Sequence, residues 1–271
     1  TVLNLEGAVT GTLVATATIG GITDSGNLSA TGNMTFNDVA EAGITLGTLQ
    51  ADANVIITAA GNTAITNDAA LNLQGSVTGT LAAIATTGDI TDSDGLTVSG
   101  NATFTTVVTN KNIVLDDEDN SFGSWVHLKA ETGGGENFTN VSFYDAGAVK
   151  IASSAAADGD LFIDAATNGA VGGTLTVAAK TGGITDAIDV VVVGNATFND
   201  VALAGITLDT LKADANVIIT AAGNTAITND TVLNLEGAVT GTLAATATAG
   251  GITDSGNLSA TGNMTFNDVA E

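Results

Sequence analysis

The chain has 271 residues, of which 44% are hydrophobic, so it has enough apolar material for one large domain or two ordinary ones. Its net charge of -24 argues against nucleic acid and anionic membranes as partners, because both need clustered cations and the chain has five, all of them lysine. No apolar run approaches the roughly 18 residues of a membrane helix, and the lack of cysteine excludes disulfides, thiolate nucleophiles and cysteine-ligated metals.

The composition favours a folded β protein. Mean hydropathy is +0.36, proline is absent, and Val, Ile, Thr and Ala are abundant, whereas disordered chains are rich in proline and charge. Proline would remove a ladder hydrogen bond from any central strand, so its absence suits a sheet in which every strand has two neighbours.

The chain is built from repeats. TVLNLEGAVTGTL at Thr1 is matched by AALNLQGSVTGTL at Ala69, returns unchanged at Thr231, and has a weaker copy in TNGAVGGTL at Thr167–Leu175. We expect repeat units at 1–68, 69–162 and 163–230 and a partial unit at 231–271, within one continuous domain over 1–271. The second unit has 94 residues against 68 in the first, which predicts about one extra coil near 113–162.

Each unit divides again into shorter segments. In the first unit these are Thr1–Gly21, Ile22–Gly43 and Ile44–Asp68, of 21, 22 and 25 residues. Short stretches that alternate apolar and polar residues are separated by Gly, Asn and Asp, a pattern typical of strands joined by turns. A coil of this length cannot bury its inward side chains alone and must stack on its neighbours. We therefore predict an all-β parallel β-helix, or β-solenoid, with about 12 coils of 21–25 residues.

Two polar positions recur in every unit. We interpret both as turn residues that hydrogen-bond to backbone, because a position copied in each unit is typical of scaffold rather than of a single active site. The residues are Asp24, Asp92, Asp186 and Asp254 in the Thr-Asp pairs, and Asn33, Asn101, Asn195 and Asn263 ahead of the Thr-Phe pairs.

The repeat is interrupted at Ile113–Ile151, a stretch that holds the only Trp, His and Tyr of the chain. Trp125, His127 and Tyr144 allow one common interpretation, an exposed surface for lateral association or glycan contact. Alternatively, Trp125 and Tyr144 form an aromatic plug buried inside a wider coil, and His127 is one more alternating β residue.

The same stretch contains the densest run of oxygen ligands in the chain. This run also allows two interpretations, a Ca²⁺ site or a solvated acidic turn, and it matches neither an EF-hand loop nor the glycine-rich nonapeptide of calcium β-rolls. No other cofactor is expected. The run comprises Asp116, Asp117, Glu118, Asp119 and Asn120.

The repeats resemble those of a known class of proteins. The phrases GDITDSDGLTVSGNATF (Gly88–Phe104) and GGITDSGNLSATGNMTF (Gly250–Phe266) are similar to the repeats of very large bacterial surface proteins of the filamentous-haemagglutinin and β-strand-repeat adhesin type. The likeness covers nearly the whole chain except about 113–162. It implies a right-handed parallel β-helix in a secreted or surface-displayed fibre.

We therefore expect a non-enzymatic structural segment of a large extracellular filament or cell-surface adhesin. Its expected partners are other copies of itself, stacked head to tail, together with glycans or a cell surface. Thr1–Glu41 and Thr231–Glu271 differ only at Val14/Ala244 and Ile19/Ala249. A 230-residue repeat of about 10 coils, roughly 48 Å long, would fit a window on a longer chain or ends that stack on other copies.

Two alternatives remain. The first is a glycan-binding or glycan-processing module that uses segment 113–151, although β-helix lyases need basic residues to hold acidic sugars and this chain has no arginine and one histidine. The second is an ice-binding protein with a flat array of threonines. The pairs Thr16/Thr18 and Thr246/Thr248 would suit such an array, but Lys180 stands at the equivalent position of the third unit and interrupts it.

Overall fold

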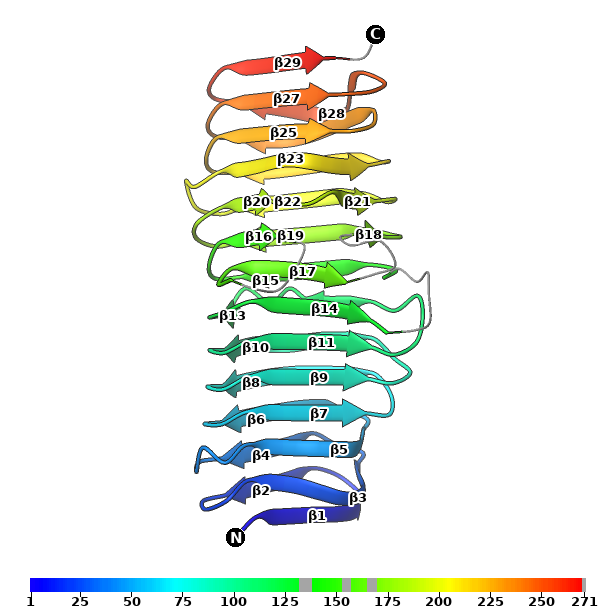
Figure 1. The fold of residues 1–271 in the computed structure, drawn as a ribbon, viewed down its shortest axis with the longest axis vertical. Coiled ribbons are helices and arrows are strands. Elements are labelled where there is room, and N and C mark those ends of the chain that lie inside the picture. Colours follow the sequence, from blue (N-terminus) through cyan, green and yellow to red (C-terminus); the bar gives the residue numbers. More distant parts are fainter. Residues whose placement is uncertain (132–137, 153–156, 165–169, 270–271) are drawn as a thin grey trace.

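The computed structural model describes residues 1–131, 138–152, 157–164 and 170–269. Figure 1 shows its strands stacked along the long axis in two facing sheets, with the two termini at opposite ends. Front strands point right, back strands point left, and the chain climbs from the N to the C end, so the coil is right-handed. The predicted all-β solenoid of about 12 turns is confirmed, and the described residues contain no helix, hence none that could cross a membrane.

All strand pairs among the described residues are parallel, and each strand lies one turn above its partner. Sheet A, at the front of Figure 1, contains in stacking order β1 (Leu3–Val9), β3 (Ile22–Ala30), β5 (Ile44–Ala51), β7 (Thr63–Asn67), β9 (Leu81–Ala85), β11 (Ala102–Thr106), β14 (Val126–Ala130), β17 (Asp160–Asp164), β16 (Val149–Ile151), β20 (Ile184–Asp186), β23 (Ile206–Ala213), β25 (Thr225–Asn229), β27 (Leu243–Ala247) and β29 (Met264–Asp268), with β18 (Ala170–Val171) and β21 (Val190–Val192) at its side.

Sheet B lies behind sheet A. It contains in stacking order β2 (Leu13–Ala17), β4 (Met34–Asp38), β6 (Asn54–Ala59), β8 (Leu71–Val77), β10 (Ile90–Val98), β12 (Ile113–Leu115), β15 (Val141–Asp145), β19 (Leu175–Ala179), β22 (Ala196–Asp200), β24 (Asn216–Ala221), β26 (Leu233–Val239) and β28 (Ile252–Ala260), with β13 (Ser121–Phe122) also paired to β10.

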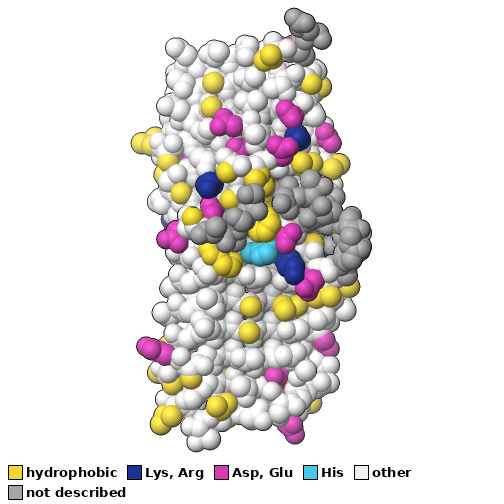
Figure 2. Space-filling model, in the orientation of Figure 1, with side chains coloured by type: hydrophobic (Ala, Val, Ile, Leu, Met, Phe, Trp, Pro, Cys, Tyr) yellow, Lys and Arg dark blue, Asp and Glu magenta, His cyan; other side chains and the backbone are white. Residues whose placement is uncertain are grey.

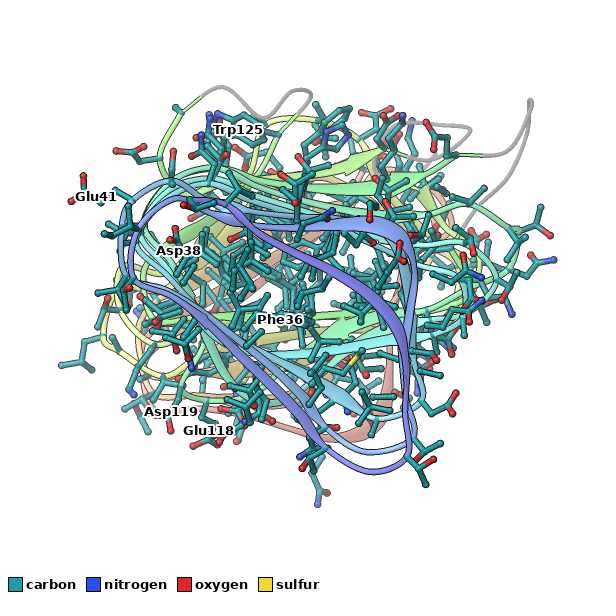
Figure 3. All side chains as sticks on the ribbon, turned by 90° about the horizontal axis from the view of Figure 1, so that it is seen from below. Phe36, Asp38, Glu41, Glu118, Asp119 and Trp125 are labelled. Carbon is teal, nitrogen blue, oxygen red and sulfur yellow. The ribbon has the colours of Figure 1, made fainter. Side chains whose placement is uncertain are left out.

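One hydrophobic core runs between the two sheets. Because successive side chains of a strand point to opposite faces, every second residue enters the core, as in β4, where Met34 and Phe36 are fully buried. Figure 3 shows Phe36 inside the ring of strands. Each buried Leu, Ile or Phe contributes about 1.5–3 kcal/mol to stability because its side chain is removed from water. The side chains of the turns above and below pack over it.

The turns are shorter than the sequence suggested. Leu3 pairs with Ile22, and Thr63 pairs with Leu81, so both of these turns close within fewer residues than the shortest predicted coil. Of the two turns between them, the one in which Ile22 pairs with Ile44 has the expected length, whereas the one in which Ile44 pairs with Thr63 is also shorter than predicted. The prediction of three coils per 68-residue unit is therefore wrong. The first unit holds seven strands, β1 to β7, which make three and a half turns.

An odd number of strands per unit places equivalent residues on opposite faces. The motif LNLEGAV forms β1 in sheet A, LNLQGSV forms β8 in sheet B, and the exact copy of LNLEGAV forms β26 in sheet B. The 230-residue repeat is thus about ten and a half turns rather than 10, and the near-identical segments 1–41 and 231–271 face opposite ways.

Among the residues that the structure describes, the second unit forms no extra coil, which corrects the second part of the domain prediction. The turn from Ile113 to Val141 is instead half as long again as the equivalent turn of the first unit, which runs from Ile44 to Thr63. A further excursion follows β16 and places β17 in sheet A between β14 and β16. Sheet A therefore has one strand more than its alternation with sheet B requires.

Candidate functional site

The repeated aspartates fasten one turn to the next. Asp24 accepts hydrogen bonds from the backbone N–H groups of Gly47 and Thr48, both at 2.8 Å, where the register of the β3–β5 pair shifts at a bulge. The acceptors therefore satisfy N–H groups that the interrupted ladder leaves open. The same pair of bonds links Asp92 to the N–H groups of Asp116 and Asp117, and Asp186 to those of Asp209 and Thr210; Asp254 occupies this place in β28.

The repeated asparagines immediately precede the strands that contain the Thr-Phe pairs. Each presents its backbone carbonyl to the N–H group that opens the strand one turn below, at 2.9 to 3.0 Å. The contacts are Asn33 with Leu13, Asn101 with Leu81, Asn195 with Leu175 and Asn263 with Leu243. Both repeated positions thus serve contacts between turns, whereas sequence reasoning assigned them to bonds within a single turn.

The acidic run does not act as one group. Asn120 is fully buried, its Oδ1 accepts from the N–H of Leu96 at 2.8 Å, and its amide donates to the Asp92 carboxylate. Burial raises the pKa of Asp92 despite these hydrogen bonds. Figure 3 shows Glu118 and Asp119 pointing outward.

This arrangement corrects the calcium prediction for Asn120, whose side chain is committed to the interior. No three acidic or histidine side chains converge as a metal site anywhere in the described part of the chain. Asp116, Asp117, Glu118 and Asp119 remain as an acidic corner after β12, with the Asp116 carboxylate 2.9 Å from the Ser142 hydroxyl that donates to it.

An aromatic plug fills the core at the irregular level, but it consists of phenylalanines. The rings of Phe104 and Phe122 meet edge to face at 6.1 Å, and those of Phe122 and Phe143 stack at 5.3 Å. All three side chains are buried. The plug therefore consists of neither Trp125 nor Tyr144, the residues to which the sequence had assigned this role.

Trp125, His127 and Tyr144 do not share a surface, which corrects the predicted contact site. His127 lies on the outer face of sheet A, where its ring stacks on Phe162 at 4.7 Å and its Nε2 is 3.1 Å from Asp164. Figure 2 shows this only histidine, in cyan, in the middle of that face among hydrophobic and charged side chains. These contacts fasten β17 to β14.

Trp125 immediately precedes β14 and is half-buried. Figure 3 places it at the edge of the cross-section opposite to Glu118 and Asp119. Tyr144 belongs to β15 in sheet B, two residues after Ser142 on the outer side of the strand.

Tyr144 lies in a groove of about 350 Å³ on the outer face of sheet B. It is only 7% exposed, and burial, aided by the negative charges of Glu118, Asp119 and Asp145, raises the pKa of its hydroxyl. The wall of the groove carries Asp116 and Glu118 at one end and Lys180 and Asn199 at the other. Among the described residues Lys180 finds no ion-pair partner, so its ammonium is available to a ligand.

Comparison with known proteins identifies the repeat. The model of a family described as repeats of unknown function (DUF5649) matches residues 1–60, 60–129 and 222–270, which is more than half of the chain. The chain belongs to the DUF5649 repeats. The DUF5649 matches leave out residues 130–221, which include β17 and the groove residues Tyr144, Lys180 and Asn199, but they include Asp116 and Glu118 at the β12 end of the groove. Searches of curated proteins and of solved structures return no match.

Proposed function

We propose that this DUF5649 chain is a non-enzymatic structural segment of a large extracellular filament or surface adhesin, as the resemblance to filamentous-haemagglutinin-type repeats implies. The observation that supports it is the continuity of the two parallel ladders, from β1 to β29 in sheet A and from β2 to β28 in sheet B. No turn is closed upon itself, so the unit that folds is the stack rather than the repeat.

The dimensions and charge suit a rod. The fourteen strands stacked from β1 to β29 span about 62 Å at a spacing of ~4.8 Å. The net charge of -24 provides repulsion between neighbouring rods and thereby disfavours lateral aggregation. Parallel sheets that add one turn after another produce an elongated rod, which is the shape that a stalk requires.

The partner in this proposal is a further turn of the same kind. Ile252, Leu258 and Phe266 line an open hollow of about 250 Å³ at the upper turn, and the Phe266 side chain is 49% exposed. In the first unit the equivalent residues Leu28 and Phe36 are buried, because β5 and β6 cover them. The burial of Leu28 and Phe36 shows the contact that one turn of this kind makes with the next.

Immunoelectron microscopy tests the proposal. Antibodies raised against the folded chain should label filaments or stalks on the outside of intact producing cells. Permeabilised cells serve as the control for access to the interior. Labelling that appears only after permeabilisation would refute the extracellular assignment, and labelling of dispersed particles without filaments would refute the structural one.

A further inference from the structure

The Tyr144 groove has counterparts elsewhere in the solenoid, because the same arrangement returns wherever one unit joins the next. At each junction a backbone N–H just after a strand donates at 2.9 Å to the carbonyl at the end of the strand below. The donors are Thr86, Lys180 and Thr248, and the acceptors are Asn67, Asp145 and Asn229. The same backbone bond recurs at other turns, for example from Val107 to Ala85. We call the three places where it falls at a boundary between repeat units the first, middle and third junctions.

The middle junction departs from the other two at positions that point outward. Register places Tyr144 where the first and third junctions have Thr66 and Thr228, and Lys180 where they have Thr86 and Thr248. Asp116 takes the place of Gly47 at the first junction and of Asp209 at the third, since the N–H groups of all three bond to the repeated aspartate one turn below. The acid is therefore shared with the third junction, whereas the phenol of Tyr144 and the base of Lys180 are specific to the middle one. Threonine satisfies the fold at both of these positions in the other two junctions, so the fold does not require its replacement by a phenol and a base.

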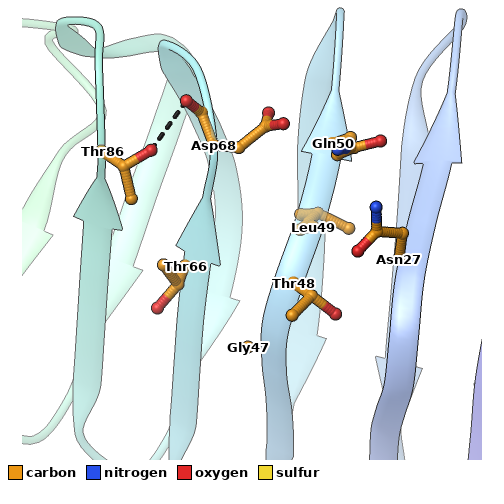
Figure 4. A pocket seen from close by; sticks show the side chains of 8 residues that line it. All are labelled: Asn27, Gly47, Thr48, Leu49, Gln50, Thr66, Asp68 and Thr86. Atoms are coloured by element: carbon orange, nitrogen blue, oxygen red, sulfur yellow. Dashed lines mark hydrogen bonds between the residues drawn. The ribbon is translucent and has the colours of Figure 1, made fainter.

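The replacement also changes the shape of the surface. At the first junction, drawn in Figure 4, the Thr86 hydroxyl donates to the backbone carbonyl of Asp68 at 2.7 Å, and the hollow has about 170 Å³. At the middle junction Lys180 makes no such side-chain bond among the described residues, and the groove has about 350 Å³. The groove is thus about twice as large and lies within the range of small-molecule sites.

The groove has a directional chemistry. It crosses β12, β15, β19 and β22, a span of about 14 Å along the rod. Asp116 and Glu118 supply hydrogen-bond acceptors at the β12 end, whereas Lys180 and Asn199 supply donors at the other end, and Tyr144 lies between them. The carboxylates do not converge on one point, so this geometry suits a ligand with many separated hydroxyl groups better than a metal ion.

We propose that the middle junction groove binds a neutral oligosaccharide laid along the rod axis. Its hydroxyls donate to Asp116 and Glu118 and accept from Lys180 and Asn199. A net charge of -24 and two carboxylates in the groove disfavour acidic sugars through like-charge repulsion. This goes beyond the proposed structural role, because it gives the rod a binding side on sheet B and does not depend on filament formation.

Tyr144 is the only tyrosine, so its absorbance reports on this groove alone. We would titrate the full chain with cellohexaose, maltohexaose and laminarihexaose, and with hexagalacturonate as the acidic comparison, by calorimetry and by ultraviolet difference spectroscopy of tyrosine. The expected result is saturable binding of at least one neutral oligosaccharide, accompanied by a tyrosine difference spectrum.

The matched variants restore the residues of the first junction. D116G/Y144T/K180T should weaken calorimetric binding at least tenfold, and K180T alone should weaken binding while keeping the tyrosine reporter. The proposal is overturned if no neutral hexasaccharide binds, if hexagalacturonate alone binds, or if the triple variant, verified as folded by circular dichroism, binds as tightly as the wild type.

Discussion

Asn67 offers a direct test of how the corners of the solenoid hold together. Its side chain is completely buried at the end of β7. It accepts a hydrogen bond from the Ala51 N–H at 2.8 Å and donates to the carbonyls of Ala51 and Ala70 at 3.3 and 2.6 Å. Asn67→Leu keeps the approximate volume of the side chain and removes all three bonds.

The expected loss of stability follows from the groups left behind. A buried donor or acceptor without a partner costs about 1–3 kcal/mol, and the substitution leaves one N–H and two carbonyls in that state. Burial of the leucine side chain returns about 1.5 kcal/mol or more. We therefore expect a net loss of about 1.5–7.5 kcal/mol in the free energy of unfolding.

The assay is urea unfolding followed by circular dichroism, combined with hydrogen exchange of the Ala51 amide, because a solenoid can lose turns locally before it unfolds as a whole. Asn37→Leu is the control: this side chain is partly exposed and donates only to the Thr16 hydroxyl at 3.3 Å, so it should change stability by less than about 0.5 kcal/mol. Asn229 repeats the Asn67 bonds to a backbone alanine, and Asn229→Leu should cost a similar amount. A loss for Asn67→Leu no larger than that of the Asn37→Leu control would refute the account of the corners.

Three other substitutions probe the irregular level and the glycines. Burial raises the pKa of Asp145 above its ordinary 3.8, so between the unfolded and the folded pKa the folded state holds a proton that the unfolded state has released, and the stability from this proton is lost as pH rises through the folded pKa. Asp145→Asn should therefore raise the melting temperature at pH 7 and lose that advantage below about pH 4. An equal gain in melting temperature at both pH values would contradict the reasoning. Gly75 has φ +112, and an added Cβ would collide with a main-chain oxygen of the preceding turn, whereas Gly7 has the same φ but open space beside it. Gly75→Ala should therefore lower the free energy of unfolding by more than about 3 kcal/mol, and Gly7→Ala should lower it by about 1–2 kcal/mol. Similar losses for the two variants in thermal unfolding would contradict the stacking of the turns. Phe122→Ala should lower the free energy of unfolding by about 3–5 kcal/mol because it removes the central ring of the aromatic plug. Phe162→Ala on the outer face should lower it by about half as much or less. A lower urea midpoint for Phe162→Ala than for Phe122→Ala would show that the plug is not the main contact.

The β-solenoid was predictable because its signal is distributed over every turn. Alternating apolar residues, turn residues at regular spacing and a repeated unit all point to stacked coils, and each depends on local rules. The half-turn was not predictable in the same way. The glycines in the sequence divide the first unit into three segments, yet the unit contains seven strands. Only the pairing of Leu3 with Ile22 and of Thr63 with Leu81 shows where each turn closes.

The irregular segment shows the same limit at single residues. Trp125 and Tyr144 are separated in the sequence by about the length of one regular turn, so their placement on one face was a reasonable expectation. The longer connection between Ile113 and Val141 shifts the phase and places Tyr144 on sheet B. Part of the groove was nevertheless visible in the sequence, because Lys180 interrupts the file of threonines. Its neighbours Asp116 and Asn199 come from other strands, and only the ladder registers bring them together.

Electron cryomicroscopy of the native filament tests the central claim most directly. A rod of stacked turns with a 230-residue repeat of ten and a half turns should show ~4.8 Å layers and equivalent features about every 50 Å, on alternate sides of the axis, so that the full axial repeat is about 100 Å. Equivalent features that return on the same side of the axis at every repeat would contradict the half-turn relation between repeats. Isolated compact particles in native material would contradict the account of this chain as a structural filament segment.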